Sequence, residues 1–212
     1  ASGVPLDVAT RRAASIADLR YNLSLVVPRA PADPITGTTT ITFELRDNTD
    51  PLVIDFETSR DHVRSVSANG ASTHYGYVNG HIVVPTTALE VGFNTIEIAF
   101  TAGNDPLNRS AEFLYALFVP ARARQAIPVF DQPDLKARWT LRLDYPAGWQ
   151  AVSNGAAVRR TTGTGPTSTV QFADRAPADL PLLLRRRRLQ GRVGPAQRPH
   201  LPHVPPRNRR DE

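Results

Sequence analysis

The sequence contains neither cysteine nor methionine. Without cysteine, a disulfide framework and a thiolate zinc site are both excluded, and the redox compartment stays open. No apolar run approaches the roughly 20 residues that span a bilayer, so no membrane span is expected. The first residue is Ala1, and no charged and then apolar leader follows it. The chain is therefore expected to be cytoplasmic, or periplasmic or secreted after removal of a signal.

The net positive charge of the chain comes from its C-terminal end. Residues 180–212 hold nine arginines, no lysine and two acidic residues, giving +7 of the overall +5, so residues 1–179 carry −2. Clustered guanidinium groups such as Arg185–Arg188 can bind polyanions. No aromatic residue lies among them to stack on a base, so nucleic acid is not an expected partner.

Alternation of apolar and polar residues dominates the body of the chain. Asn69-Gly70 and Asn79-Gly80 are typical of tight hairpin turns. Residues 5–16 have weak helical spacing and predict a short helix or an irregular arm. The fold class is therefore all-β, an antiparallel saddle or sandwich of about ten strands. The predicted strands are 21–26, 38–45, 52–56, 62–68, 82–85, 95–101, 113–119, 139–145, 150–153 and 168–172.

The pattern fails at the C-terminal end. Leu182–Leu184 runs directly into Arg185–Arg188, and six prolines lie between Pro181 and Pro206. A segment with neither period nor turn signals predicts disorder. We therefore expect two parts, a β domain over residues 1–178 and a disordered Arg/Pro-rich tail over residues 179–212.

No catalytic, metal-binding or substrate-binding residue is predicted. None of the five histidines belongs to an H-E-x-x-H motif, which would place two imidazoles and a general base on one helical face. His200 and His203 flank Pro202, which excludes a helix there. His62, His74 and His81 are interpreted as exposed strand residues. Two further candidates are interpreted as a turn and a loop, Ser153-Asn154-Gly155 and the Gly163–Gly165 segment.

The most informative stretch runs from Phe113 to Trp139. It predicts a strand, a turn with concentrated charge and a second strand. Asp131 is suited to capping backbone N–H groups, and Pro133 favours an extended residue before it. Four cations in the stretch can pair with Asp131 and Asp134, which predicts a structural ion-pair network; they are Arg122, Arg124, Lys136 and Arg138.

This stretch resembles the signature R-x-x-F-P-x-F-D-x-P-x-x-K-A of the first domain of the aminopeptidase N family. The matching residues, interpreted as structural, are Arg124, Pro128, Phe130, Asp131, Pro133, Lys136 and Ala137. The likeness extends in order over residues 6–175. It includes Asp18–Leu23 as an opening strand and Leu141–Gly155 as a closing hairpin.

The resemblance implies a saddle-shaped β domain packed against a thermolysin-like catalytic domain, which would be its partner. In the family that catalytic domain holds zinc with H-E-x-x-H and a distant Glu, and grips the substrate with G-x-M-E-N. This chain has neither motif, so we expect no cofactor in it and no activity from it alone. Where many members place a polar substrate contact, this chain has Ala116–Pro120, so no such contact is assigned.

The tail resembles a segment read in a shifted frame. A one-nucleotide shift of the coding sequence of 179–190 and 199–212 permits residues like the family's continuation, so we expect a frameshifted tail and a truncated chain.

The leading interpretation is a non-catalytic N-terminal accessory domain of a zinc aminopeptidase. The alternatives are a self-standing β-sandwich interaction module and an arginine-tail protein that engages anionic surfaces.

Overall fold

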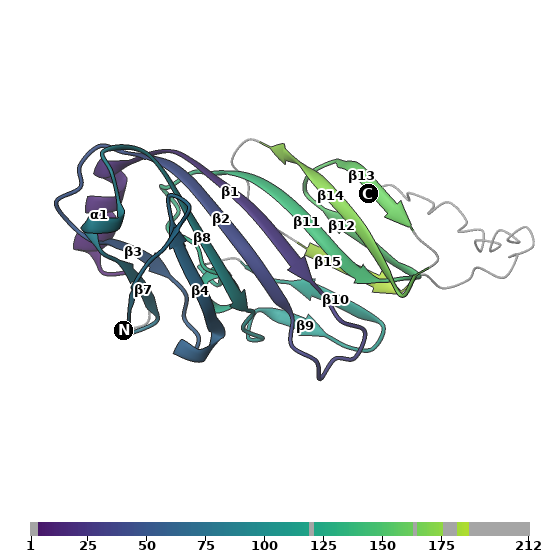
Figure 1. Cartoon of the computed structure of the whole chain (residues 1–212). Coiled ribbons are helices and arrows are strands. Elements are labelled where there is room, and N and C mark those ends of the chain that lie inside the picture. Colours follow the sequence, from purple (N-terminus) through teal and green to yellow (C-terminus); the bar gives the residue numbers. More distant parts are fainter. Residues whose placement is uncertain (1–3, 119–120, 163–164, 176–181, 187–212) are drawn as a thin grey trace, which may run out of the picture.

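The computed structural model describes residues 4–118, 121–162, 165–175 and 182–186. They form one α-helix and three β-sheets (Figure 1). The all-β prediction is confirmed. The large sheet runs along the molecule, and the two smaller sheets lie against one side of it at opposite ends.

Helix α1 (Leu6–Ser15) opens the described chain. Asp7 in the first turn stabilises the helix by interacting favourably with its dipole. It also pairs with Arg11 one turn later, at 3.0 Å. The helix ends at Ile16, whose extended backbone leads straight into the first strand. The weak helical spacing of residues 5–16 therefore does give a helix.

The large sheet has eight strands in the order β13-β14-β11-β1-β2-β8-β4-β5. Alternation buries one face of each long strand, as in β1, where Tyr21, Leu23 and Leu25 point inward. The strands are β1 (Ile16–Val26), β2 (Thr36–Leu45), β4 (Val63–Ala68), β5 (Ala71–Ser72), β8 (Gly92–Thr101), β11 (Arg138–Pro146), β13 (Ala157–Thr162) and β14 (Thr167–Arg175).

The prediction of a purely antiparallel fold is wrong for one pair. Strands β1 and β11 are parallel, with Leu23 opposite Leu141, so the large sheet is mixed. Parallel neighbours need a long crossover connection, and here the chain passes through the other sheets before it returns as β11. Alternation of side chains carries no information on strand direction, which is why the sequence did not reveal this.

The two smaller sheets cover the inner face of the large one. One has the order β12-β15-β10-β9, with β9 (Leu107–Arg109), β10 (Phe113–Ala116), β12 (Trp149–Ser153) and β15 (Leu182–Arg186). The other has the order β3-β7-β6, with β3 (Leu52–Asp55), β6 (Gly76–Val78) and β7 (His81–Val84). The described residues also form three short 3₁₀ turns, at Arg60–His62, Thr86–Ala88 and Ala123–Gln125.

Strand β15 corrects part of the tail prediction. Leu182–Arg186 were expected to be disordered, but they pair with both β10 and β12. Each neighbour offers an open backbone edge, and backbone pairing of that kind does not require alternation in the added strand. The rest of the predicted tail, residues 179–181 and 187–212, lies outside the described residues.

Both Asn-Gly turns are confirmed. Asn69 and Gly70 have φ of 51° and 82°, and Asn79 and Gly80 have φ of 50° and 76°. Two successive residues with positive φ are typical of the type I′ hairpin that joins antiparallel strands with the correct twist. The turns connect β4 to β5 and β6 to β7.

The core lies between the large sheet and the two smaller ones. Phe56 and Phe100 meet edge to face at 5.7 Å, and Phe43 and Phe130 do so at 6.3 Å. Phe130 comes from the long connection between β10 and β11. That connection therefore completes the core, and its polar contacts define the site described next.

Candidate functional site

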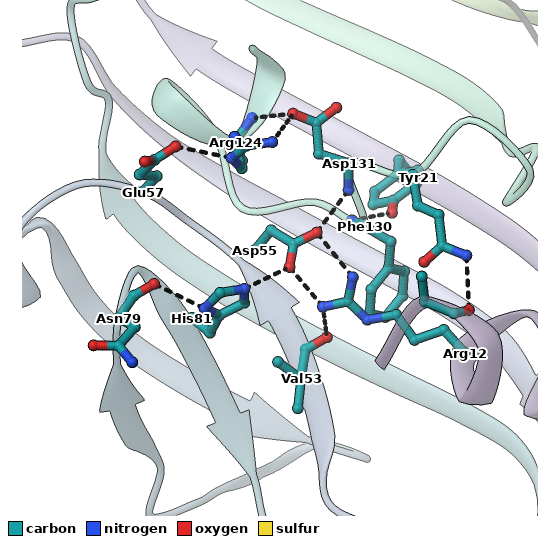
Figure 2. Close-up of polar contacts among 12 residues, drawn as sticks. Arg12, Tyr21, Val53, Asp55, Glu57, Asn79, His81, Arg124, Phe130 and Asp131 are labelled. Atoms are coloured by element: carbon teal, nitrogen blue, oxygen red, sulfur yellow. Dashed lines mark hydrogen bonds and ion pairs between the residues drawn. The ribbon is translucent and has the colours of Figure 1, made fainter. Parts of the chain in front are cut away.

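Asp55 is the centre of a buried polar network (Figure 2). It is the last residue of β3 and is fully buried. Arg12 from α1, only 4% exposed, donates from Nη2 to Oδ1 at 2.6 Å and from Nη1 to Oδ2 at 2.9 Å. Arg12 Nη2 also donates to the carbonyl oxygen of Val53. Bidentate pairing of this kind fixes the guanidinium plane and offsets much of the desolvation cost of both charges.

The same carboxylate holds the β10–β11 connection in place. The backbone N–H of Asp131 donates to Asp55 Oδ2 at 2.9 Å. The backbones of Asp55 and Val129 also exchange two hydrogen bonds, of 2.8 and 3.0 Å. A single buried residue thus joins the helix, the three-stranded sheet and the connection.

His81 approaches Asp55 from β7. Its Nε2 lies 3.4 Å from Asp55 Oδ1, and its Nδ1 lies 2.8 Å from the carbonyl oxygen of Asn79 (Figure 2). The interpretation of His81 as an exposed strand residue is therefore wrong, because its ring is largely covered at the edge of the network. His74 is exposed as predicted but lies outside the strands, and His62 is half-buried in the 3₁₀ turn Arg60–His62, so the interpretation as exposed strand residues is wrong for both.

Tyr21 supports the connection from the large sheet. Its hydroxyl oxygen accepts the backbone N–H of Phe130 at 2.8 Å, and its ring stacks on Trp139 at 4.0 Å. Burial raises the pKa of Tyr21 far above its usual value of 10.0, since water no longer solvates the phenolate. The Arg12 guanidinium lies over the Phe130 ring at 5.2 Å, so the aromatic and ionic contacts share one site.

Arg124 and Asp131 form a second group of contacts. Asp131 Oδ2 accepts the backbone N–H of Arg124 at 3.1 Å and lies 3.8 Å from its guanidinium, which confirms the predicted capping and pairing. Arg124 Nε also donates to Glu57 at 2.8 Å, a contact the sequence did not suggest. Burial raises the pKa of Asp131, and the Arg124 backbone N–H and guanidinium oppose the rise.

The positions of the sequence signature divide by burial. Arg124, Pro128, Phe130 and Ala137 are buried, and Asp131 is half-buried. Pro133 and Lys136 are exposed. Arg122 donates to the carbonyl oxygen of Asp105 and to Gln125 rather than to an aspartate of the connection. Of the covered members, Arg124, Phe130 and Asp131 contact the network.

Gly103 lies close to the backbone of the connection. Its N–H donates to the carbonyl oxygen of Ala126 at 3.3 Å. A Cβ atom built on Gly103 would lie 1.9 Å from the carbonyl oxygen of Gln125. Only glycine allows the chain after β8 to pass this close.

Within the described residues, no group of three or more His, Asp or Glu side chains is arranged to hold a metal ion. His200 and His203 lie outside that part of the chain. Ser153 ends β12 and is followed by a bend at Asn154 and Gly155, as its interpretation as a turn requires. Gly163 is not described, and Gly165 lies in a bend. Among the described helices, none is long and apolar enough to cross a bilayer.

An apolar surface lies on the outer side of the four-stranded sheet. Its members are 36–54% exposed, and we call them the sheet face: Phe113, Tyr115, Leu117 and Val152. The Phe113 and Tyr115 rings stack at 6.0 Å. Tyr115 and Val152 are both paired with Leu183 of β15, from opposite sides, so they share one face of the sheet.

The sequence did not reveal Arg12, Asp55 and Glu57. One signal was available, since Asp55 interrupts the apolar run from Leu52 to Phe56. An acidic residue inside a buried strand requires a partner, but nothing in the sequence names Arg12 as that partner.

Comparison with known proteins finds a family match that covers the β domain and ends before the C-terminal tail. The family model described as "Peptidase M1 N-terminal domain" matches residues 17–178. Aminopeptidase N of Streptomyces lividans is 26% identical over 126 residues, 55% of this chain and 14% of that protein. Putative aminopeptidase-2 of Caenorhabditis elegans is 31% identical over 75 residues, 35% of this chain and 4% of that protein.

Solved structures agree with the fold. The M1 zinc metallopeptidase of Deinococcus radiodurans superposes with a TM-score of 0.65 at 25% identity, covering 81% of this chain and 42% of that one. A structure described as a two-domain M1 zinc metallopeptidase gives the same TM-score and coverage at 24% identity. The chain therefore spans less than half the length of these proteins.

Proposed function

The chain belongs to the family of peptidase M1 N-terminal domains, and we propose that it acts as the non-catalytic N-terminal domain of a zinc-dependent aminopeptidase. The match over residues 17–178 carries this proposal. The relatives are named as aminopeptidases and zinc metallopeptidases, and each is much longer than the part that matches. Hydrolysis and zinc binding would then reside in a separate catalytic domain.

The sequence supports a division of labour between the two domains. None of the 212 residues forms an H-E-x-x-H motif, which supplies two zinc ligands and a general base in many metallopeptidases. Zinc bound in the catalytic domain would supply an activated water for attack on the peptide carbonyl. The present chain would supply structure and a docking surface.

The signature residues have a structural role in this proposal. Phe130 and Asp131 are held through their backbone N–H groups by Tyr21 and Asp55, and the Asp131 carboxylate is turned toward Arg124. Groups already engaged in this way are not available to a substrate. Their contribution is to fix the β10–β11 connection between the sheets.

The sheet face is the surface proposed to contact the catalytic domain. Apolar surface at the core of an interface with polar residues around it is typical of domain contacts. Tyr115 combines an exposed ring with a hydroxyl that accepts a hydrogen bond from Asn108 at 2.8 Å, which keeps the ring oriented. The two-domain architecture of the similar solved structure supports a catalytic domain as the occupant.

The domain boundary is also part of the proposal. We place the end of the family-like sequence near residue 178, where the family match ends, with Leu182–Arg186 beyond it adding β15 to the four-stranded sheet, and we attribute the composition of residues 179–212 to a shifted reading frame. Sequencing of the coding DNA tests this directly. An open frame encoding H-E-x-x-H within the following few hundred bases after a one-nucleotide shift would support it, and its absence would contradict it.

Activity and association test the main proposal. The full chain supplied with zinc should release no amino acid from peptide substrates. It should bind the Deinococcus radiodurans enzyme from which the matching N-terminal segment has been deleted, as measured by sedimentation. Tyr115→Lys should weaken that association about tenfold, whereas Val158→Lys, at an exposed apolar residue of β13, should not.

Two results would contradict the proposal. Zinc-dependent hydrolysis by the chain alone would overturn the non-catalytic assignment. Equal effects of Tyr115→Lys and Val158→Lys would exclude the sheet face as the docking surface. Binding to an unrelated target without any catalytic domain would favour a self-standing interaction module.

A further inference from the structure

Strand β15 connects the other strands of the four-stranded sheet. It lies between β12 and β10, and within the described residues those two strands are joined through it (Figure 1). Leu182–Arg186 pair with β10 at three positions and with β12 at five, antiparallel to both. Neighbouring strands lie about 4.8 Å apart, so the space that β15 fills between its two neighbours is roughly 9.6 Å wide. We call this space the strand slot; its walls are Phe113–Ala116 and Trp149–Ser153.

The walls of the strand slot and the strand that fills it come from different parts of the sequence. Both walls lie within the family match over residues 17–178, whereas Leu182–Arg186 lie beyond its end. The slot is therefore built by the family-like sequence and filled by a segment outside it. Such a segment is accepted because backbone hydrogen bonds supply most of the affinity in strand addition and depend little on side-chain identity.

The walls set one side-chain requirement for the occupant. The position of Leu184 is paired with Leu114 on one side and Ala151 on the other, and both of these residues are 1% exposed. The position of Leu183 falls in the row of the sheet face, whose members are 36–54% exposed. Because successive residues of a strand face opposite sides, an occupant needs an aliphatic residue at the first position and not at the second.

From this arrangement we propose that the strand slot is a binding site for an extended segment of a second polypeptide, with an aliphatic residue at the position of Leu184. The bound segment takes the place of β15 and forms backbone hydrogen bonds with both walls at once. In the free protein β15 is the competing occupant from the same chain. The proposal does not depend on a catalytic partner, since both walls are in this chain.

Fluorescence anisotropy on the full chain provides the test, with a labelled peptide of the five-residue sequence Leu182–Arg186 as the probe. In the wild-type chain β15 competes from the same molecule at an effective concentration in the millimolar range. Leu184→Asp introduces a carboxylate at the position between Leu114 and Ala151, so it should release β15 from the slot. The probe should then bind this variant at least about tenfold more tightly than the wild-type chain.

Two controls are matched to this variant. Leu183→Asp makes the same substitution one position earlier, in the exposed row, so β15 should stay in place and probe binding should remain as weak as in the wild-type chain. A probe that carries Leu184→Pro lacks one backbone donor and is unsuited to a strand with neighbours on both sides, so it should not bind. This second probe keeps both arginines and therefore controls for adsorption of a cationic peptide.

Hydrogen exchange on the wild-type chain gives a second test that needs no substitution. Excess probe should raise the exchange of Leu182–Arg186 as β15 is displaced. The exchange of Phe113–Ala116 and Trp149–Ser153 should stay low, because the probe replaces the lost backbone partner of both walls. Adsorption of the probe elsewhere would leave all three segments unchanged. This measurement decides the matter if Leu184→Asp does not fold, which its urea midpoint would show.

Three results would overturn the proposal. They are no binding of the probe by a folded Leu184→Asp chain up to about 1 mM, equal binding by the wild-type, Leu184→Asp and Leu183→Asp chains, or unchanged exchange of Leu182–Arg186 under excess probe. None of these measurements involves a catalytic domain, so failure here and failure of the proposed function are distinguishable.

Discussion

Arg12 and Asp55 form a bidentate ion pair between α1 and β3 across a sequence separation of 43 residues. Both side chains are buried, and the Asp55 carboxylate also accepts the backbone N–H of Asp131. The pair thus links the N-terminal helix to a connection more than a hundred residues further along the chain.

Loss of one partner of this pair should be costly. Arg12→Met leaves the Asp55 charge buried without its counter-ion, so unfolding free energy should fall by about 3–5 kcal/mol in urea titrations. Arg11→Met is the matched control, because Arg11 pairs with Asp7 and Asp50 at the surface, and it should cost less than about 1 kcal/mol. Similar losses in the two variants would show that the buried pair contributes nothing specific.

Removal of the Tyr21 hydroxyl should leave a buried donor unpaired. Tyr21→Phe keeps the ring that stacks on Trp139 but removes the acceptor for the Phe130 N–H, so stability should fall by about 1–3 kcal/mol. Tyr115→Phe removes an exposed hydroxyl and should change stability by less than about 0.5 kcal/mol. A Tyr21→Phe variant as stable as wild type would contradict the role given to this hydrogen bond.

Alkaline pH should expose the raised pKa of Tyr21. As the pH rises above 10.0, the unfolded chain releases this proton and the folded chain keeps it, so unfolding becomes progressively more favourable. Tyr21→Phe lacks this contribution and should lose stability less steeply above pH 10. The difference between the two urea midpoints should therefore shrink as pH rises from 9 to 11, and a constant difference would contradict the prediction.

Gly103 should tolerate no side chain. Gly103→Ala forces the segment after β8 away from the carbonyl oxygen of Gln125, so we expect a loss of roughly 2 kcal/mol or more in unfolding free energy. In Gly76→Ala the added methyl group would meet Val83 at an ordinary 3.5 Å, without positive φ, and this variant should remain close to wild type. Thermal unfolding of the two variants in parallel separates local crowding from a general glycine effect.

The chain alone should self-associate through the sheet face. Tyr115→Lys interrupts the stacked Phe113–Tyr115 pair with a charge, so it should lower the sedimentation-averaged mass at high protein concentration. Val158→Lys should have less effect. A wild-type chain that stays monomeric at millimolar concentration would contradict this expectation.

Much of the fold was predictable because half-buried strands leave a pattern of period two. The pattern failed where geometry departs from a regular strand. Asp18 has φ of 49° and lies at a bulge between Ala17 and Arg20, so the first part of β1 was missed. Strand β13 was missed because all six of its residues are exposed, which leaves no alternation to detect.

The site was predictable only where its partners are close in sequence. Asp131 and Arg124 are seven residues apart, and their contact was predicted and is present. Arg12, Asp55 and Tyr21 are brought to the same connection by the packing of three separate elements. The sequence alone does not show this packing, so it cannot identify which buried charged residues form a pair.

The parallel pairing of β1 with β11 imposes an order on folding. During synthesis β1 can join β2 as soon as both have emerged from the ribosome, but its other edge has no partner until residues 138–146 follow. Until then an apolar strand keeps a free row of backbone donors and acceptors, which other nascent chains can capture. The sheet closes late, so a slowing of translation between β2 and β11 lengthens the interval in which this edge of β1 is open to other chains.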